Sequence, residues 1–200
     1  DALLLGVDYV AEFTGHLKAY SLINNQTNGF TVSTGDFASI ILHNKPWNKS
    51  MNVINGDFDN DGDEDIVFVG YKNDTLGTYM FRKESTGYTI QDLGFQFDPQ
   101  DQAMATCDID NDLDLDILFG NSVLLNQSGF TKMDILPFKT VLSMDWSDYD
   151  GDGDPDVAVF GQDTVDNHVT RIYVNLGNLN FTELKYEFQS FEGTGNVRWL

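Results

Sequence analysis

Short apolar runs alternate with polar stretches along the whole chain, and one order of runs occurs four times. Each occurrence opens with an aspartate, continues with three or four apolar residues and reaches a glycine. These openings are residues 1–6, 65–70, 116–120 and 156–161. A second apolar stretch follows in each copy, around Tyr20, Tyr79, Leu124 and Tyr173. The recurrence predicts four copies of one structural unit.

Each copy continues in the same way. A polar turn leads to an aromatic residue followed by threonine, at Phe30, Tyr88, Phe130 and Phe181. Fourth apolar stretches lie near residues 51–54, 103–106, 141–146 and 197–200. The stretches are short, rich in β-branched and aromatic residues, and bounded by Gly, Asn, Asp and Ser, as β-strands are. We therefore expect an all-β chain without helices, and a tight hairpin at Gly120-Asn121.

A unit of about 40–60 residues with four short strands is typical of a β-propeller blade, which must stack on its neighbours to bury both faces. We therefore predict a partial β-propeller over residues 1–200, built from blades of four antiparallel strands. The predicted units are 1–56, 57–107, 108–147 and 148–200. A β-sandwich is the alternative, but a sandwich does not require every second turn to carry one motif.

Half of the acidic residues lie in three nine-residue windows, 57–65, 108–116 and 148–156. The chain has 32 Asp and Glu against 11 Lys and Arg, a net charge of −21, and the windows hold 6, 5 and 5 of the acids. Nucleic acid and anionic membranes carry the same sign, so the charge excludes them as partners. No apolar run reaches the roughly 20 residues of a membrane helix. Carboxylates concentrated in turns indicate cations as partners.

Aspartate occupies positions 1, 3, 5, 7 and 9 of each window. Carboxylates at alternate positions of a tight loop point to a common centre, and Ca²⁺ takes about six to eight oxygen ligands. We expect positions 1, 3, 5 and 9 to bind through carboxylates, and position 7 through its backbone carbonyl. The predicted cofactor is Ca²⁺, at about three sites. The predicted ligands are Asp57, Asp59, Asp61, Asp63, Asp65, Asp108, Asp110, Asp112, Asp114, Asp116, Asp148, Asp150, Asp152, Asp154 and Asp156.

Other metal-binding motifs fit these windows less well. An EF-hand needs Glu at position 12 and flanking helices, whereas position 12 is Phe68, Phe119 or Val159. Magnesium sites usually use one or two carboxylates with a phosphate, and three His with one Cys make zinc unfavourable. Leu113 stands at position 6, where the sharp turn favours glycine, so we expect the 108–116 site to bind more weakly.

The loop motif, followed by an apolar strand and Phe-Gly or Val-Gly, resembles the FG-GAP repeat of integrin α-subunit propellers and the related VCBS repeats. Residues 146–156, with 171–175 and 180–182 downstream, look most like repeats in secreted and surface proteins of Bacteroidetes. The resemblance implies a seven-bladed propeller with calcium in loops between the first two strands of a blade. The chain departs from the pattern at Leu113, and the Gly-Ala-Pro part of the motif is absent.

Asp1 matches the last loop position, and Trp199 stands where Trp146 stands, two residues before a loop. We therefore expect the chain to be a mature or truncated segment, with the remaining blades of its propeller as partners. Cys107 is the only cysteine, so no internal disulfide can form. Millimolar calcium fills modest sites outside cells, so the predicted location is extracellular or at the cell surface.

The three histidines belong to no nucleophile motif, and the prediction is that the chain is not an enzyme. We expect a calcium-stabilised scaffold that binds a protein or a cell-surface or glycan ligand, without membrane insertion. Two alternatives remain open, namely a carbohydrate-binding lectin and a structural spacer of a large surface protein. Loops on rigid scaffolds often carry function, and the candidate stretches are 8–14, 43–50, 71–78 and 162–167.

Overall fold

The structure is a computed structural model in which every described element is a β-strand, sixteen in all. The all-β prediction is confirmed for these residues. The chain divides into two compact units, a first unit of residues 1–51 and 67–96 and a second unit of residues 52–66 and 97–200. The described residues are 2–11, 14–24, 30–33, 42–44, 52–72, 75–85, 87–97, 101, 103–186, 188 and 195–199.

None of the described segments forms a helix long and apolar enough to cross a bilayer.

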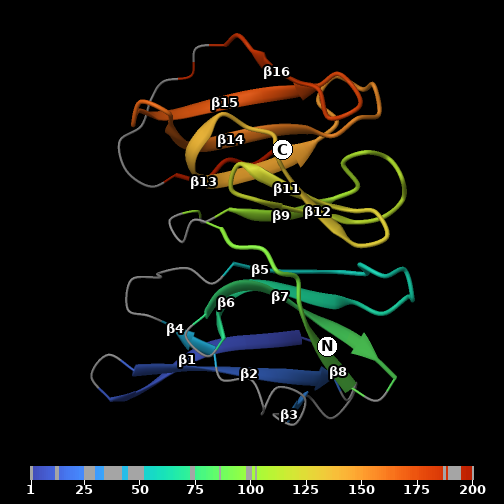
Figure 1. Cartoon of the computed structure of the whole chain (residues 1–200), viewed down its shortest axis with the longest axis vertical. Coiled ribbons are helices and arrows are strands. Elements are labelled where there is room, and N and C mark those ends of the chain that lie inside the picture. Colours follow the sequence, from blue (N-terminus) through green and yellow to red (C-terminus); the bar gives the residue numbers. More distant parts are fainter. Residues whose placement is uncertain are drawn as a thin grey trace. The chain divides into compact units, whose positions relative to one another are not determined.

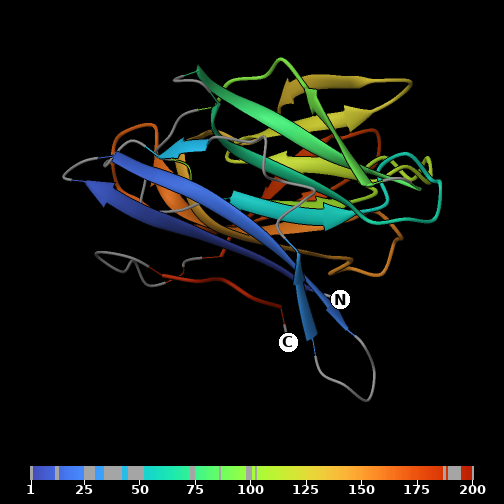
Figure 2. The same ribbon diagram turned by 90° about the horizontal axis from the view of Figure 1, so that it is seen from below.

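The first unit contains β1 to β4, most of β6, β7 and β8, and β2 is the longest described strand at 11 residues. β1 and β2 pair antiparallel from Ala2↔Leu22 to Ala11↔Thr14, and β3 pairs with the end of β2 (Figure 2). β4 then joins β2 to β6, and the sheet order is β1-β2-β4-β6-β7-β8, with β5 beside β6. The bounds are β1 Ala2–Ala11, β2 Thr14–Asn24, β3 Phe30–Ser33, β4 Leu42–Asn44, β5 Asn52–Gly56, β6 Asp65–Lys72, β7 Thr75–Glu84 and β8 Gly87–Asp92.

The second unit contains two separate four-stranded antiparallel sheets (Figure 1). Their orders are β12-β11-β10-β9 and β13-β14-β15-β16, so in each sheet neighbours in sequence are neighbours in space. The first sheet has β9 Met104–Cys107, β10 Asp116–Phe119, β11 Ser122–Asn126 and β12 Phe130–Asp134. The second has β13 Phe138–Ser147, β14 Asp156–Asp163, β15 His168–Asn175 and β16 Phe181–Leu184. Both sheets have the strand number and order expected of a blade.

The predicted units differ from the observed sheets in two respects. Each four-stranded sheet begins one strand before its acidic window, because the window is a hairpin connection between paired strands, β9–β10 and β13–β14. β5-β6-β7-β8 have the same order, but the pair Leu42↔Lys72 continues their sheet to β4 and so to β1–β3. The boundaries of the predicted units therefore fall inside sheets.

The last predicted strand, residues 197–200, is not a strand over its described part. Residues 195–199 instead lie along β13, where the Val197 N–H donates to Ser143 Oγ at 3.0 Å. The Trp199 N–H donates to Asp145 Oδ2 at 2.8 Å. Asp1 and Leu200 lie outside the described residues.

The core of the second unit lies between its two sheets. The central strands β10 and β14 are buried along their apolar lengths, and they pack with residues of β9, β11 and β13. The cluster includes Leu118, Val123, Val141, Val157 and Val159, all 0–1% exposed. Each such side chain contributes about 1.5–3 kcal/mol on burial. Stacking of adjacent sheets therefore stabilises both.

The predicted hairpin at Gly120-Asn121 is confirmed, since Phe119 pairs with Ser122 across it. Gly120 has a φ of 59°, and a Cβ there would lie 2.4 Å from a carboxylate oxygen of Asp101. Asp101 is buried, and its Oδ1 accepts the Val141 N–H of β13 at 2.7 Å. The turn of one sheet thus leaves room for a carboxylate that holds the next sheet.

Candidate metal centres

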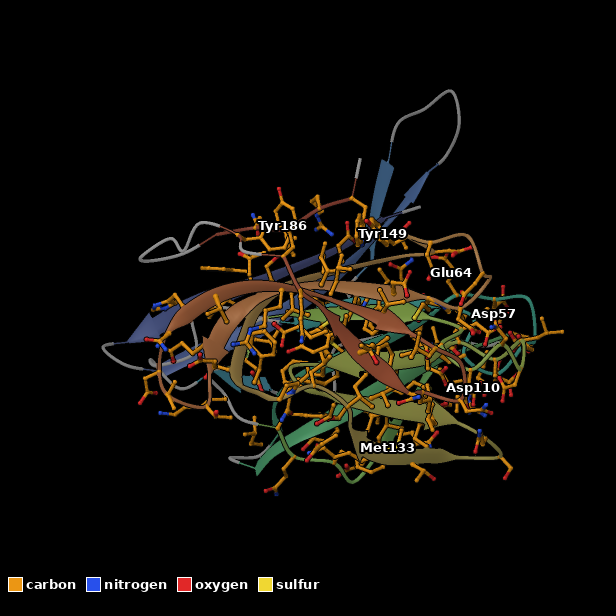
Figure 3. The ribbon with its side chains drawn as sticks, turned by 90° about the horizontal axis from the view of Figure 1, so that it is seen from above. Asp57, Glu64, Asp110, Met133, Tyr149 and Tyr186 are labelled. Atoms are coloured by element: carbon orange, nitrogen blue, oxygen red, sulfur yellow. The ribbon has the colours of Figure 1, made fainter. Side chains whose placement is uncertain are left out.

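The three acidic windows form three loops of the second unit, here called loop one (57–65), loop two (108–116) and loop three (148–156). They join β5 to β6, β9 to β10 and β13 to β14. Each therefore connects the first two strands of a blade-like sheet, as the family resemblance implies. Figure 3 labels Asp57 and Glu64 of loop one and Asp110 of loop two on the same side of the view.

The aspartate at position 1 folds each loop around its own carboxylate. In loop one, Asp57 accepts the N–H groups of Asp61 and Gly62 at 3.1 and 3.0 Å. Asp108 makes the equivalent pair in loop two, at 3.0 Å each. Asp148 accepts the N–H groups of Gly151 and Gly153 in loop three, at 2.8 and 3.1 Å. Side-chain to backbone hydrogen bonds of this kind favour tight turns over strand pairing.

Position 6 has the same left-handed backbone in all three loops. Gly62 and Gly153 have φ values of 93° and 94°, and Leu113 has 76°. Glycine reaches this region without steric cost, whereas a residue with a Cβ is strained there. Leu113 is also 84% exposed, so no packing of its side chain offsets the strain. The expected weakness of loop two has a structural basis here, although binding itself stays a prediction.

The aspartate at position 9 is buried and ties the loop to the sheet. Asp116 accepts the Ile109 N–H at 2.9 Å and the Asn126 N–H at 2.8 Å. Asp156 repeats this pattern with Tyr149 and Asn175, at 2.7 and 2.8 Å. In loop one, Asp65 accepts the N–H of Phe58 at 3.2 Å. Position 9 therefore has a structural role in each hairpin.

The structure brings nine of the fifteen predicted ligands into three triads, in which one oxygen from each residue lies within 4.8 Å of the others. Loop one contributes positions 1, 3 and 5, and the other two loops contribute positions 1, 3 and 9. The triads are Asp57, Asp59 and Asp61; Asp108, Asp110 and Asp116; and Asp148, Asp150 and Asp156. The other six predicted ligands lie outside these triads, and they are Asp63, Asp65, Asp112, Asp114, Asp152 and Asp154.

Clustering of negative charge is unfavourable at the triads. Burial, and after it the charges of Asp110 and Asp112, raises the pKa of Asp116 to about 6, although hydrogen bonds from the N–H groups of Asn126 and Ile109 oppose the shift. Two carboxylates about 4 Å apart repel by roughly 4 kcal/mol at an effective dielectric near 20. A cation in the triad would remove both penalties.

The hydrogen bonding of Asp110 in loop two indicates whether the triad residues fit a cation. Asp110 Oδ2 accepts Gln127 Nε2 at 2.7 Å, whereas Asp110 Oδ1 is shielded from solvent and has no hydrogen-bond partner. A buried carboxylate oxygen without a partner is costly. All donors of the triads are carboxylate oxygens, the ligands preferred by hard cations such as Ca²⁺ and Mg²⁺. The residues present therefore fit such an ion.

Within the described residues, no further group of His, Cys, Asp and Glu side chains lies close enough together to hold a metal ion. Cys107 is partly buried, and burial raises the pKa of its thiol, as expected of a packed side chain rather than a nucleophile. His168 stacks on Phe160, with ring centroids 6.1 Å apart. The side chains of His16 and His43 lie outside the described part of the chain.

Sequence analysis missed several residues that shape the loops. Asn60 and Asn111, at position 4, donate to carboxylates of the following loops. Asn126 donates through Nδ2 to Phe58 O at 2.7 Å, and Asn175 stands at the same place in the next sheet. The recurrence of Asn at equivalent positions was the available signal. The partners of these side chains were not evident from spacing, since they lie on other hairpins.

Comparison with known families now adds to this geometry. The family described as FG-GAP-like repeat matches residues 57–119, from the start of loop one to the end of β10. Residues 57–119 are an FG-GAP-like repeat. No curated protein and no solved structure matched the chain.

The FG-GAP-like segment includes loops one and two. Loop three lies beyond it but has the same aspartates, the same positive φ at position 6 and the same buried position 9. The family resemblance predicted from the loop motif is thus confirmed over residues 57–119. The matching family is a repeat rather than an enzyme family.

Proposed function

We propose that the three loops bind Ca²⁺ and that the bound ions hold the hairpins of the second unit in shape. The observation that carries the proposal is that each of the three loops, two of them within the FG-GAP-like segment, brings three aspartates together with one oxygen from each within 4.8 Å of the others. An acidic turn that served solubility alone would not need converging carboxylates in every copy. Three or more carboxylates in one loop favour Ca²⁺ over Mg²⁺.

The triad residues would hold the ions, with position 7 contributing its backbone carbonyl as the loop pattern predicts. Bound Ca²⁺ would supply charge compensation and a cross-link within each hairpin. Because the folded loops bring together carboxylates that are apart in the unfolded chain, binding adds to the free energy of unfolding. At a free calcium concentration 100 times the Kd, each site adds about 2.7 kcal/mol.

Calorimetric titration and thermal unfolding test the calcium proposal. We expect Ca²⁺ uptake with a stoichiometry near three, and a Tm that rises with calcium and falls in EGTA. The variant Asp110→Asn should lose about one site. The matched control is Asp166→Asn, which changes an exposed aspartate beside Lys139 outside the loops and should keep all sites. No heat of binding together with a Tm indifferent to EGTA would refute the proposal.

We further propose that the chain is part of a seven-bladed propeller that acts as an extracellular binding or adhesion scaffold. Sites of moderate affinity fill only where calcium is near millimolar, which is outside the cell. Rigid sheets present exposed turns for ligand contact. Of the four candidate stretches, 162–167 is the one wholly described, and its turn carries Val165 at 70% exposure. Parts of 8–14, 43–50 and 71–78 lie outside the described residues.

The scaffold proposal is tested by binding assays on extracellular protein and glycan arrays, with calcium and with EGTA. Calcium-dependent binding to a protein supports the adhesion scaffold. Binding to glycans alone would favour the lectin alternative, and binding to neither would favour a structural spacer. Substitutions in the turn 164–167 should weaken ligand binding without changing calcium uptake if this turn contacts the ligand.

A further inference from the structure

One asparagine of each of the first two acidic loops forms a hydrogen bond to the loop that follows it. Asn60 of loop one donates through Nδ2 to Asp114 Oδ1 of loop two at 2.6 Å. Asn111 of loop two donates through Nδ2 to Asp154 Oδ1 of loop three at 2.7 Å and to Gly153 O at 3.3 Å. Both asparagines occupy position 4, and both acceptors occupy position 7. The same bond therefore recurs with the same polarity along the row of loops.

The asparagine side chain is needed for this bond but not for the fold of its own loop. Asn60 and Asn111 have φ values of 58° and 60°, a region that asparagine tolerates better than most residues. Gly151 stands at position 4 of loop three with a φ of 78°. Glycine thus supports the same turn without a donor. A change of Asn to Gly at this position removes the amide while keeping the backbone conformation.

The acceptor residue of this bond is hydrogen-bonded to both loops. The Asp114 N–H donates to Asp112 Oδ1 at 3.0 Å within loop two, whereas the Asp114 carboxylate accepts the amide of Asn60 from loop one.

A second connection joins the same two loops, because Asn126 donates to Phe58 O of loop one. The Asn126 N–H in turn donates to Asp116 of the loop-two triad. Asn126 therefore links the triad of loop two to the backbone of loop one through two hydrogen bonds.

We propose that Asn60 and Asn111 are positioning residues that make cation binding in neighbouring loops cooperative, an inference that rests on the proposed calcium function. Without a cation, repulsion drives the carboxylates of a loop apart, and the position 7 side chain leaves the place where the asparagine meets it. With a cation, the loop is fixed and presents the acceptor. The hydrogen bond therefore differs between the two states, which is the requirement for coupling.

The coupling is reciprocal, so a cation in loop one strengthens loop two as much as the reverse. An exposed hydrogen bond to a carboxylate is at the weak end of such effects, and we expect about a fivefold change in affinity. Loops one and two are coupled through Asn60, and loops two and three through Asn111. The two asparagines therefore couple only loops that are neighbours in sequence.

The test isolates one pair of loops by calorimetric titration of the full chain with Ca²⁺. Loop three is disabled by Asp148→Asn with Asp150→Asn. In this background the affinity of loop one should be about fivefold higher with loop two intact than with Asp108→Asn and Asp110→Asn added. Asn60→Gly should abolish the fivefold difference. Asn111→Gly is the matched control, because its acceptor lies in the disabled loop, and it should leave the difference unchanged.

A second variant separates the bond from effects on folding. Asp114→Ala removes the acceptor but keeps the backbone carbonyl of position 7, and it should abolish the coupling as Asn60→Gly does. The double variant should lose no more than either single one. Asp114→Asn, which retains an acceptor oxygen, should keep most of the coupling. Urea unfolding in EGTA establishes that each variant is folded.

The outcomes distinguish the coupling from the calcium function. Uptake at three sites that titrate independently, or a fivefold difference that survives Asn60→Gly and Asp114→Ala, would overturn the coupling and leave the calcium function standing. Absence of uptake by the unaltered chain would overturn both. Loss of the difference in Asn111→Gly as well would show a general loosening of the loops and would also overturn the role of Asn60.

Discussion

Loops two and three reach one backbone conformation with different residues. Loop two has Asn111 and Leu113 where loop three has Gly151 and Gly153, yet all four positions have positive φ values between 60° and 94°. In both loops the position 1 carboxylate accepts the N–H of position 6, and the position 9 carboxylate accepts that of position 2. The carboxylates therefore impose the turn, and glycine lowers the cost of adopting it.

The two loops differ in how much strain they store. A residue with a Cβ in the left-handed region costs about 1–2 kcal/mol relative to the right-handed one, and Leu113 exposes its apolar side chain in addition. Burial also raises the pKa of Asp116. Desolvation likewise raises the pKa of Asp150 in loop three, so the backbone strain at position 6 is what makes loop two the less favourable copy.

The largest effect is expected at the buried aspartate of loop three. Asp156→Ala leaves the N–H groups of Tyr149 and Asn175 without an acceptor. Each such loss costs about 1–3 kcal/mol, so we expect the free energy of unfolding to fall by about 2–6 kcal/mol. Urea unfolding in EGTA measures this without any contribution from bound calcium.

The equivalent change in loop two should have a similar effect. Asp116→Ala leaves the N–H groups of Ile109 and Asn126 without an acceptor, so it should also lower the free energy of unfolding. Asp152→Ala is the control, since this exposed residue accepts one N–H within its loop and should have the smallest effect in EGTA. Equal losses for Asp152→Ala and Asp156→Ala would contradict the structural role of position 9.

An intermediate effect is expected when the residues at position 6 are exchanged. Leu113→Gly should strengthen calcium binding by loop two, and Gly153→Leu should weaken it in loop three. A difference of about 1 kcal/mol corresponds to roughly fivefold in Kd. Calorimetric titration in variants with the other loops disabled gives the two affinities.

Leu113→Ala serves as the control for this exchange. Alanine shortens the exposed side chain but keeps the Cβ that causes the strain. If Leu113→Ala gained as much affinity as Leu113→Gly, exposure of the leucine side chain rather than the backbone would be responsible for the weakness of loop two.

The smallest effect is expected at an acidic turn that has no triad. Asp163 accepts the N–H groups of Asn167 and Val165. These hydrogen bonds, chiefly the one from Asn167, lower the pKa of Asp163. A lowered pKa in the folded state means that Asp163 adds stability above the ordinary aspartate pKa, and that this is lost as pH falls through the lowered value.

We therefore expect Asp163→Ala to lower the Tm near pH 7 in EGTA, and the difference from the unaltered chain to shrink in acid. Asp166→Ala in the same turn is the comparison, because Asp166 faces Lys139 instead of these N–H groups. A Tm difference at Asp163 that stayed constant between pH 7 and pH 2.5 would show that the charge of the carboxylate is not what stabilises the turn.

Much of the fold was predictable because it is local. The apolar runs that begin at Asp65, Asp116 and Asp156 gave the second strands of their sheets, and the aromatic-threonine pairs gave the last ones. The loop aspartates were predictable for the same reason, since alternate positions of a hairpin face one centre. The triads bring nine of them together, and metal binding by these residues stays a prediction.

The rest depends on contacts between hairpins that no local pattern contains. Strand pairing across each loop made the sheets begin one strand before the predicted units, and the short strand β4 extended the first sheet. The sequence assigned Asp116 and Asp156 to the metal motif and did not predict that they also accept backbone N–H groups. The partners of Asn60 and Asn126 lie more than 50 residues away.

Gly120 has a consequence for how this chain can vary. A Cβ at this position would clash with the carboxylate of Asp101. The same carboxylate accepts the Val141 N–H of the following sheet. A mutation at Gly120 alone would displace that carboxylate and free an amide far along the chain. Accommodating a side chain there would require a compensating change at Asp101, so in related sequences these two positions should change together or not at all.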